Sequence, residues 1–236
     1  MEIFKKPRLI ILSICLAIFS NLTAQNVLIL KDSLIFNEAT VVLQEVKFPY
    51  LSKNEKIYKQ IHEIWNSNDY LNYNTPEQRL YAKKRDLAKL IDSGIVMDAA
   101  FPIESYEINY NKKDIIGLSI KLNVIGSPFE GMQYLTIDLK VKKIIKSDLF
   151  KNNQELVKII KKRIQQEEGD LSKLIVDTKN FQLVTNAKGC LQSVVFHIYD
   201  NRKEGYRANS YFPEYSISIE KNTIYKYISS TYKSRL

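Results

Sequence analysis

Residues 116–124, with the sequence Ile-Gly-Leu-Ser-Ile-Lys-Leu-Asn-Val, form the most regular alternating pattern of the chain. Apolar side chains occupy every second position, and glycine, serine, lysine and asparagine lie between them. Because successive side chains of a strand point to opposite faces, one face of this segment is apolar and the other polar. The pattern predicts a β-strand with one face on the core and the other in water.

Two neighbouring segments repeat this alternation. Tyr106, Ile108 and Tyr110 form a stripe before it, and residues 133–141 carry inward apolar positions after it. The connection at residues 126–131 has a glycine at each end. Three consecutive strands joined by short connections predict an antiparallel meander.

Helices are predicted on both sides of the meander. Ser52 and Glu55 form a capping box ahead of a helix at about residues 53–66, whose apolar face includes Ile61. A second helix has a capping threonine, a first-turn proline, a capping-box glutamine and a terminal glycine, which are Thr75, Pro76, Gln78 and Gly94. A third is predicted at about residues 153–166, where Leu156, Ile160 and Ile164 share one face.

The other predicted elements complete the order. Short apolar runs at 27–30 and 34–36 predict either a strand pair or one interrupted edge strand. The others are a strand at 40–48, a helical turn at 171–175, a hairpin of 181–184 and 191–199, a strand at 215–219 and a terminal helix containing residues 224–232. Strands and helices do not alternate regularly, which favours an α+β fold of antiparallel meander and hairpin strands packed by amphipathic helices. We expect an N-terminal region at 25–140 and a C-terminal region at 141–236, packed together as one unit.

Residues 1–24 have the order of a secretory signal peptide. Lys5, Lys6 and Arg8 precede a short apolar run, and Ala24 is a small residue at the expected cleavage site. No later segment is long and apolar enough to span a bilayer. The sequence therefore predicts an exported protein, periplasmic or extracellular, without a transmembrane segment after cleavage.

The composition indicates which kinds of partner the protein can bind and whether disulfides can stabilise it. The formal net charge is +9, but lysines are scattered along the chain, which is typical of solvated faces and does not indicate a nucleic-acid partner. Cys15 lies in the signal peptide, so Cys190 has no intramolecular disulfide partner. We expect Cys190 to be a small buried residue.

The sequence contains no recognisable catalytic, metal or cofactor site. Its two histidines are His62 and His197. His62 is followed by Glu63, but Asn66 occupies the position of the second histidine of a zinc-protease helix. We expect His62 at the surface or boundary of its helix and His197 as a structural histidine with satisfied hydrogen bonds. No glycine-rich phosphate loop is present, and carboxylates alone do not identify a glycosidase pair.

Aromatic and basic residues near the C-terminus indicate a possible binding surface. Tyrosines at 199, 206 and 211 lie close in sequence to arginines at 202 and 207, and both residue types are favoured at binding hot spots. The loop at 126–131 offers a second contact. The alternative is that these tyrosines are half-buried on a sheet. The candidate binding residues are Phe129, Glu130, Tyr199, Arg202, Tyr206, Arg207 and Tyr211.

The order of several short segments resembles a known extracytoplasmic family. The matching stretches include Tyr134-Leu135-Thr136-Ile137-Asp138, Asp148-Leu149-Phe150 before an amphipathic helix, Phe196-His197-Ile198-Tyr199-Asp200 and Tyr215-Ser216-Ile217-Ser218-Ile219. The segment at 46–50 resembles the companion N-terminal region of that family. The pattern is similar to the PdaC/RsiV-like domains, which form the non-catalytic N-terminal region of peptidoglycan deacetylases and the outer region of lysozyme-sensing anti-sigma factors.

This resemblance implies a non-catalytic binding module of the cell envelope. Its ligand would be an envelope protein such as a lysozyme-like muramidase, or peptidoglycan itself. The basic charge suits an acidic polymer better than a basic lysozyme. The alternatives are an uncharacterised envelope hydrolase, which would need two convergent carboxylates or an acid-paired His197 in a pocket, and an accessory structural subunit.

Overall fold

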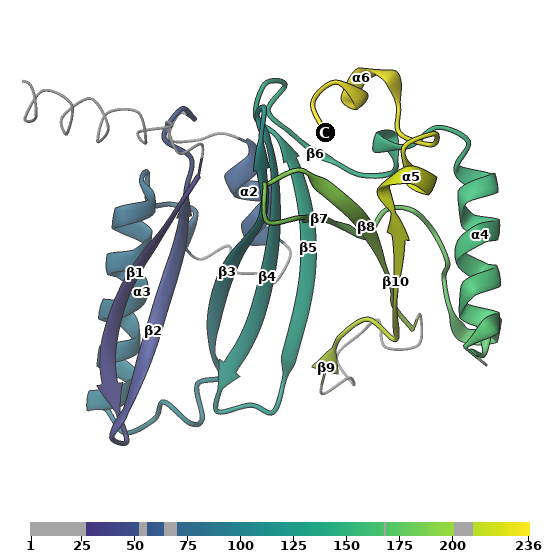
Figure 1. Cartoon of the computed structure of the whole chain (residues 1–236). Coiled ribbons are helices and arrows are strands. Elements are labelled where there is room, and N and C mark those ends of the chain that lie inside the picture. Colours follow the sequence, from purple (N-terminus) through teal and green to yellow (C-terminus); the bar gives the residue numbers. More distant parts are fainter. Residues whose placement is uncertain (1–26, 52–55, 64–69, 168, 201–209) are drawn as a thin grey trace, which may run out of the picture.

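The structure is a computed structural model that describes residues 27–51, 56–63, 70–167, 169–200 and 210–236. The predicted signal peptide and the predicted capping box at residues 52–55 lie outside these ranges. The α+β class is confirmed: three antiparallel sheets alternate in space with helices along the molecule (Figure 1). None of the helices in the described ranges has the length and apolar character that a membrane span requires.

The predicted meander forms the central sheet. Its strands are β3 (Phe101–Lys112), β4 (Ile115–Ile125), β5 (Glu130–Asp138) and β6 (Lys143–Ile145), in that order, and β9 (Ser210–Tyr211) also pairs with β5. The water-facing side predicted for β4 is wrong at its first half, because every residue from Ile115 to Ile120 is buried. The reason is tertiary: β7 of a second sheet packs against β3, β4 and β5.

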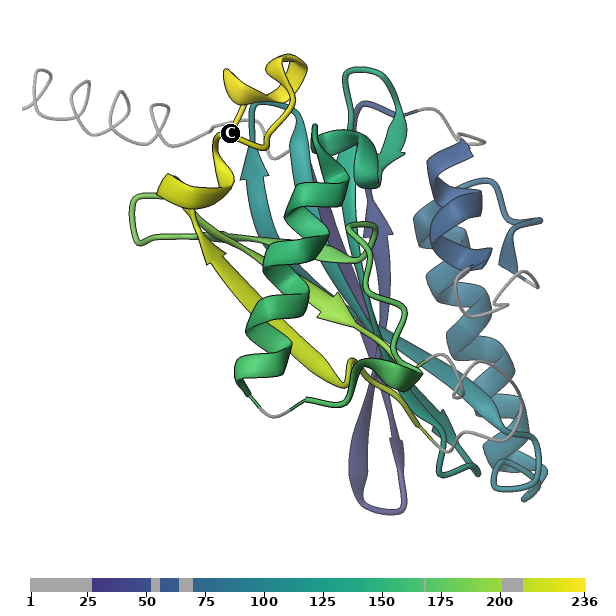
Figure 2. The ribbon, with the colours of Figure 1, turned by 90° about the vertical axis from the view of Figure 1, so that its right-hand side faces the viewer.

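The second sheet has the order β10-β8-β7 and includes the predicted hairpin. Its strands are β7 (Phe181–Thr185), β8 (Leu191–Ile198) and β10 (Tyr215–Glu220). The predicted helix α4 (Asn153–Gln166) lies across this sheet (Figure 2) and buries Leu156, Ile160 and Ile164 in its core. Tyr110 and Ile115 from the central sheet join the same core, which couples the two predicted regions. Their boundary near residue 140 stays a prediction.

Two predictions for the C-terminal region are wrong. The single terminal helix is replaced by two short helices, α5 (Lys221–Ile224) and α6 (Ser230–Lys233), because Ile228 pairs with Phe150 between them. Cys190 is partly exposed instead of buried, since it lies in the turn before β8, where its Sγ is 3.5 Å from the Lys112 Nζ. The 171–175 segment contains the 3₁₀ helix η3 (Leu171–Lys173), and η2 (Ser147–Leu149) precedes α4.

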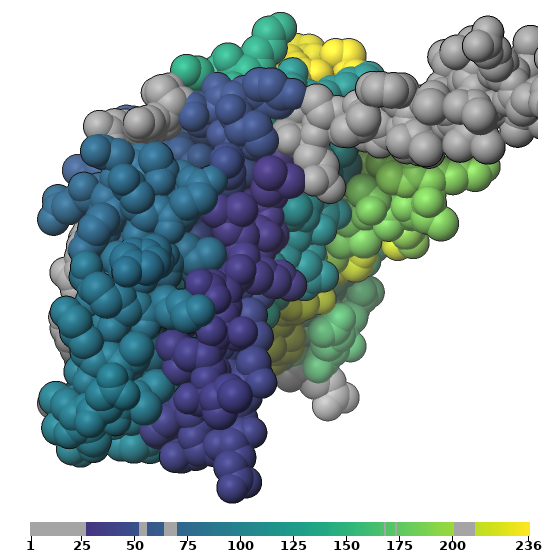
Figure 3. All heavy atoms as spheres, turned by 90° about the vertical axis from the view of Figure 1, so that its left-hand side faces the viewer, coloured from purple at the N-terminus to yellow at the C-terminus, as the bar shows by residue number. Residues whose placement is uncertain are grey.

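The third sheet is the hairpin of β1 (Leu28–Phe36) and β2 (Ala39–Lys47), which lies beside α3 (Pro76–Asp92) at one end of the molecule (Figure 3). Of the two alternatives for residues 27–36, the structure has the single strand, and β1 continues without interruption from Leu28 to Phe36. The capping box of Thr75 and Gln78 is confirmed, with both reciprocal hydrogen bonds present. The first predicted helix is described as α2 (Lys56–Glu63), and its Ile57 and Ile61 pack on the central sheet.

Gly126 fixes the turn that connects β4 to β5. Its φ is +81°, and a Cβ at this position would lie 2.0 Å from the Met97 carbonyl oxygen, so an added side chain meets rigid backbone. Gly94 has a similar φ of +74° but has open space around its Cβ position. Substituting each glycine by alanine therefore separates two energetic costs. Both substitutions strain the backbone at a positive φ, but only the one at Gly126 also forces a side chain against Met97.

We predict that Gly126→Ala lowers the free energy of unfolding by about 3 kcal/mol, because conformational strain and overpacking combine. Gly94→Ala, which adds only the strain, should cost about 1 kcal/mol. Urea unfolding of both variants measures the difference, and equal losses would show that the chain at Met97 moves aside without cost.

Candidate ligand-binding site

A groove of about 390 Å³ lies beside the outer edge of β5, where the central sheet, α2 and the segment before β7 meet. Its volume lies within the range of ordinary small-ligand sites. The lining residues are Gln60, Glu63, Gln133, Tyr134, Leu135, Ile144, Ile145, Lys146, Lys179 and Asn180.

The groove exists because two short strands cover only the ends of this edge. β6 pairs with β5 at Thr136–Asp138, and β9 pairs with it at Glu130 and Gly131. No strand in the described part of the chain pairs with residues 132–135 on this side. β6 stops after Ile145 because the chain turns into η2, where the Lys146 N–H donates to Asp148 Oδ1 at 2.8 Å.

The side chains of β5 diverge to the two sides of the groove. Leu135 and Ile137 pack in the core that also holds Ile61 of α2, and Gln133 lies on the same face by strand alternation. Tyr134 lies on the opposite face and stacks on His197, with ring centroids 3.5 Å apart and planes 4° from parallel. The groove therefore runs across the edge of the sheet from one face to the other.

His197 is a buried support for Tyr134. Its Nδ1 lies 3.0 Å from Ser216 Oγ, and burial lowers its pKa to about 4, so the ring is neutral at physiological pH. Its Nε2 has no hydrogen-bond partner among the described residues, which corrects the expectation of a histidine with satisfied hydrogen bonds. These contacts do not pair His197 with a carboxylate, which is the arrangement that the predicted alternative of a hydrolase would need.

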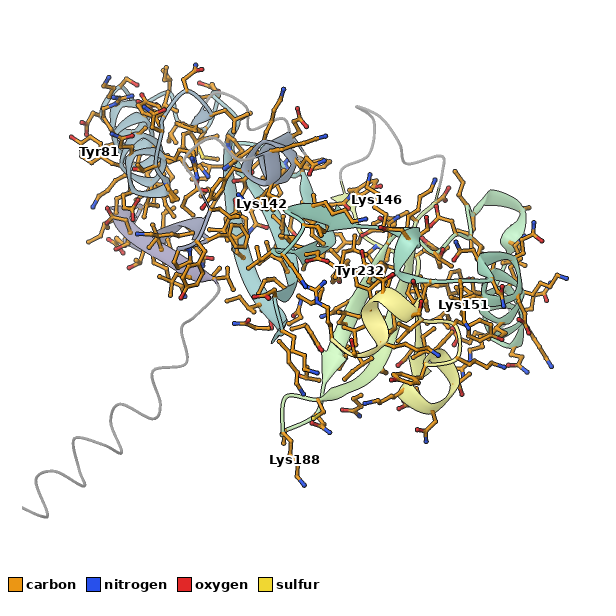
Figure 4. All side chains as sticks on the ribbon, turned by 90° about the horizontal axis from the view of Figure 1, so that it is seen from above. Tyr81, Lys142, Lys146, Lys151, Lys188 and Tyr232 are labelled. Atoms are coloured by element: carbon orange, nitrogen blue, oxygen red, sulfur yellow. The ribbon has the colours of Figure 1, made fainter. Side chains whose placement is uncertain are left out.

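Polar groups of complementary kinds line the groove. Gln60, Gln133 and Asn180 carry side-chain amides, which both donate and accept hydrogen bonds. Lys146 and Lys179 are exposed cations, and the Lys179 Nζ is 3.8 Å from the Asp177 carboxylate. Lys146 lies near the middle of the molecule, where its two halves meet (Figure 4). The lining thus suits a ligand that carries hydroxyls, amides and carboxylates.

The structure brings four of the seven predicted binding residues together at the other end of the same β5 edge. Phe129 directly precedes β5, Glu130 is its first residue, and Tyr211 of β9 pairs with Gly131. The Tyr211 ring stacks on Tyr199 with centroids 4.7 Å apart. Whether these residues bind a ligand stays a prediction, and the other three, Arg202, Tyr206 and Arg207, lie outside the described ranges.

Tyr199 is part of the scaffold rather than of an exposed surface. It is 7% exposed, and its hydroxyl donates to the Met132 carbonyl at 2.9 Å. Burial raises the pKa of this hydroxyl well above its ordinary value. The alternative that the tyrosines are partly buried on a sheet therefore describes Tyr199.

A buried charge cluster between β2, α2, α3 and β3 overturns the expected position of His62. The residues Glu45, His62, Arg79, Lys83 and Glu104 are each at most 5% exposed. The His62 Nε2 is 3.1 Å from Glu45, and the Lys83 Nζ is 3.2 Å from Glu45 and 2.9 Å from Glu104. His62 is buried because the inner face of α2 closes over these charges.

The cluster is closed to solvent, and its opposite charges are paired with one another. Burial raises the pKa of Glu45, but the Lys83 charge and the hydrogen bond with His62 outweigh burial and hold that pKa at about 2. The two carboxylates that converge here share the Lys83 ammonium between them and are closed to solvent. Among the described residues, no three side chains of His, Cys, Asp or Glu are arranged to hold a metal ion.

We predict that Glu45→Gln lowers the free energy of unfolding by about 3 kcal/mol at neutral pH, because it leaves buried cations without their partner. The native pKa of about 2 lies below the ordinary value of 4.5, so the contribution of Glu45 is present above pH 4.5 and is lost as the pH falls toward 2. The difference between wild type and variant should shrink over that interval.

Urea unfolding across this pH range checks the prediction. Glu77→Gln is the matched control, since Glu77 forms an exposed ion pair with Lys47 at 2.5 Å and should contribute less than about 1 kcal/mol. A pH-independent difference for Glu45→Gln would contradict the assigned ionisation.

Comparison with known proteins gives the fold. No family model matches the sequence, and no curated protein is similar to it. The structure is similar to a DUF3298 family member from Bacteroides fragilis, with a TM-score of 0.51, 12% identity and coverage of 87% of this chain and 93% of that one. A DUF3298 protein from Pseudomonas aeruginosa has a TM-score of 0.46 and 12% identity, covering 86% of this chain and 94% of that one.

DUF3298 is the family of PdaC/RsiV-like domains, so the fold of the first neighbour agrees with the resemblance found in the sequence. The chain is therefore similar in fold to proteins of an uncharacterised domain family.

Proposed function

We propose that the protein is an exported, non-catalytic binding module of the cell envelope, and that peptidoglycan is its ligand. The observation that carries the proposal is the groove at Tyr134, which combines three side-chain amides with two exposed lysines. Peptidoglycan offers hydroxyl and acetamide groups along its glycan and carboxylates on its peptides. Each of these groups has a complementary hydrogen-bond partner in the groove.

Charge favours the same class of ligand. The full chain has a formal net charge of +9, of which the predicted signal peptide carries +2 (Lys5, Lys6 and Arg8 against Glu2), so the mature part has +7. This charge accelerates association with an acidic polymer and opposes docking of a basic muramidase. The family resemblance also implies a lysozyme-like protein as ligand. Binding of such a protein is therefore an alternative outcome of the test below and is not what we propose.

The lining of the groove supports binding over hydrolysis. Glycoside hydrolysis ordinarily uses two carboxylates on opposite sides of the scissile bond. Among the described lining residues, Glu63 is the one that carries a carboxylate, and its Oε1 is 3.7 Å from the Lys59 ammonium. The buried Glu45 and Glu104 lie in the charge cluster and do not line this groove.

We predict that the purified mature protein sediments with insoluble peptidoglycan sacculi at physiological salt. Reversing both groove charges, with Lys146→Glu and Lys179→Glu, should weaken retention at least tenfold, because each lost charge-assisted hydrogen bond costs about 1.5–3 kcal/mol. Co-sedimentation over a range of sacculus concentrations measures the change.

The control is Lys151→Glu with Lys188→Glu, which changes the net charge equally at two exposed lysines that do not line the groove (Figure 4). Equal losses in both double variants would contradict a specific groove and indicate general charge attraction. Failure of the wild type to sediment, with capture of a muramidase from a purified panel instead, would overturn peptidoglycan as the ligand.

A further inference from the structure

Two contacts establish which backbone groups of β5 face the groove. The Leu139 N–H, just past the strand, donates to the Asp114 carbonyl beside β4 at 2.8 Å. The Met132 carbonyl points the other way, because it accepts from the Tyr199 hydroxyl at 2.9 Å. The β4–β5 register runs from residue 130 to residue 138 without a shift.

Strand geometry extends this result along β5. The N–H and C=O of one residue point to the same side, and successive residues alternate. The even-numbered residues of β5 therefore direct their backbone groups away from β4. Glu130 and Thr136 meet β9 and β6 in this way, while Tyr134 directs its N–H and C=O into the gap between those strands.

The unpaired part of this sheet edge is the Tyr134 backbone, because the Met132 carbonyl on the same side already accepts from the Tyr199 hydroxyl. No hydrogen bond from a described residue reaches the Tyr134 backbone on this side. Unpaired edges bind extended peptides by adding a strand, with the main chain supplying affinity. Residues 132–135 span about 13 Å at the rise of a strand, which limits the added strand to about four residues.

The surroundings of the gap decide which occupant fits. A strand of a second copy of this chain would run on past four residues and collide with β6 or β9, which close the two ends. A short peptide does not have this conflict. Lys146 and Lys179 line the same groove and provide cations for peptide carboxylates.

We propose that the β5 edge at Tyr134 binds the peptide stem of peptidoglycan, with one peptide unit of the stem pairing with the Tyr134 backbone as an added strand would. The backbone of Tyr134 pairs with the backbone of the stem, and the two lysines hold its carboxylates. This inference rests on the proposed function and deepens it, because it assigns recognition to the peptide rather than to the glycan.

Amide hydrogen exchange, followed by NMR on the wild-type protein, tests the pairing directly. The probe is a soluble disaccharide-tetrapeptide muropeptide, and the comparison ligand is the same disaccharide without its peptide. At saturation the muropeptide should slow exchange of the Tyr134 amide at least tenfold. The amides of Gln133 and Leu135, which face β4, should change little, and the bare disaccharide should protect none of the three.

Two variants separate backbone from side chain. Tyr134→Pro removes the outward N–H while leaving the hydrogen bonds to β4, and it should abolish muropeptide binding. Tyr134→Phe keeps the ring and the backbone, and it should bind as wild type does. If the proline variant does not fold, the wild-type exchange measurement still decides the proposal.

The outcomes distinguish this inference from the function on which it rests. Sedimentation with sacculi without protection of Tyr134 by the muropeptide would overturn strand addition and leave envelope binding intact. Equal protection by the bare disaccharide would overturn the assignment to the peptide. Absence of binding to sacculi and to muropeptide would overturn both proposals.

Discussion

The rest of the structure depends on one constraint, which is that both faces of the central sheet are covered. The first half of β4 is buried on both sides, between α2 with the β1–β2 hairpin and the β10-β8-β7 sheet. A sheet enclosed in this way can meet a ligand only along its edges or at the ends of its strands. The partly covered edge of β5 is such a place, and both candidate surfaces, the Tyr134 groove and the Phe129–Tyr211 end, lie along it.

Local signals in the sequence predicted the elements well. The capping box at Thr75, the apolar spacing of α4 and the alternation in the meander each depend on neighbours within a few residues, and each is present. The errors arise where distant segments meet. The polar face of β4 is covered by β7, and His62 is buried because Glu45, Arg79 and Lys83 converge on it from other elements.

The candidate site was less predictable for the same reason. Aromatic enrichment pointed to Tyr199 and Tyr211, which do gather at the β5 edge, but the sequence left binding and burial open, and only the structure shows that Tyr199 is buried. The groove depends on where β6 ends and where β9 joins, and strands of three and two residues leave little pattern in a sequence. Lys146 and Lys179 carried no signal among many scattered lysines.

A structure of the protein bound to a muropeptide would show how the β5 edge is used. We expect the peptide to lie beside residues 132–135, paired with the Tyr134 backbone and with a carboxylate near Lys146 or Lys179. A muropeptide bound instead on the surface of Phe129 and Tyr211, or held by its sugars alone with the β5 edge unpaired, would overturn peptide recognition at this edge.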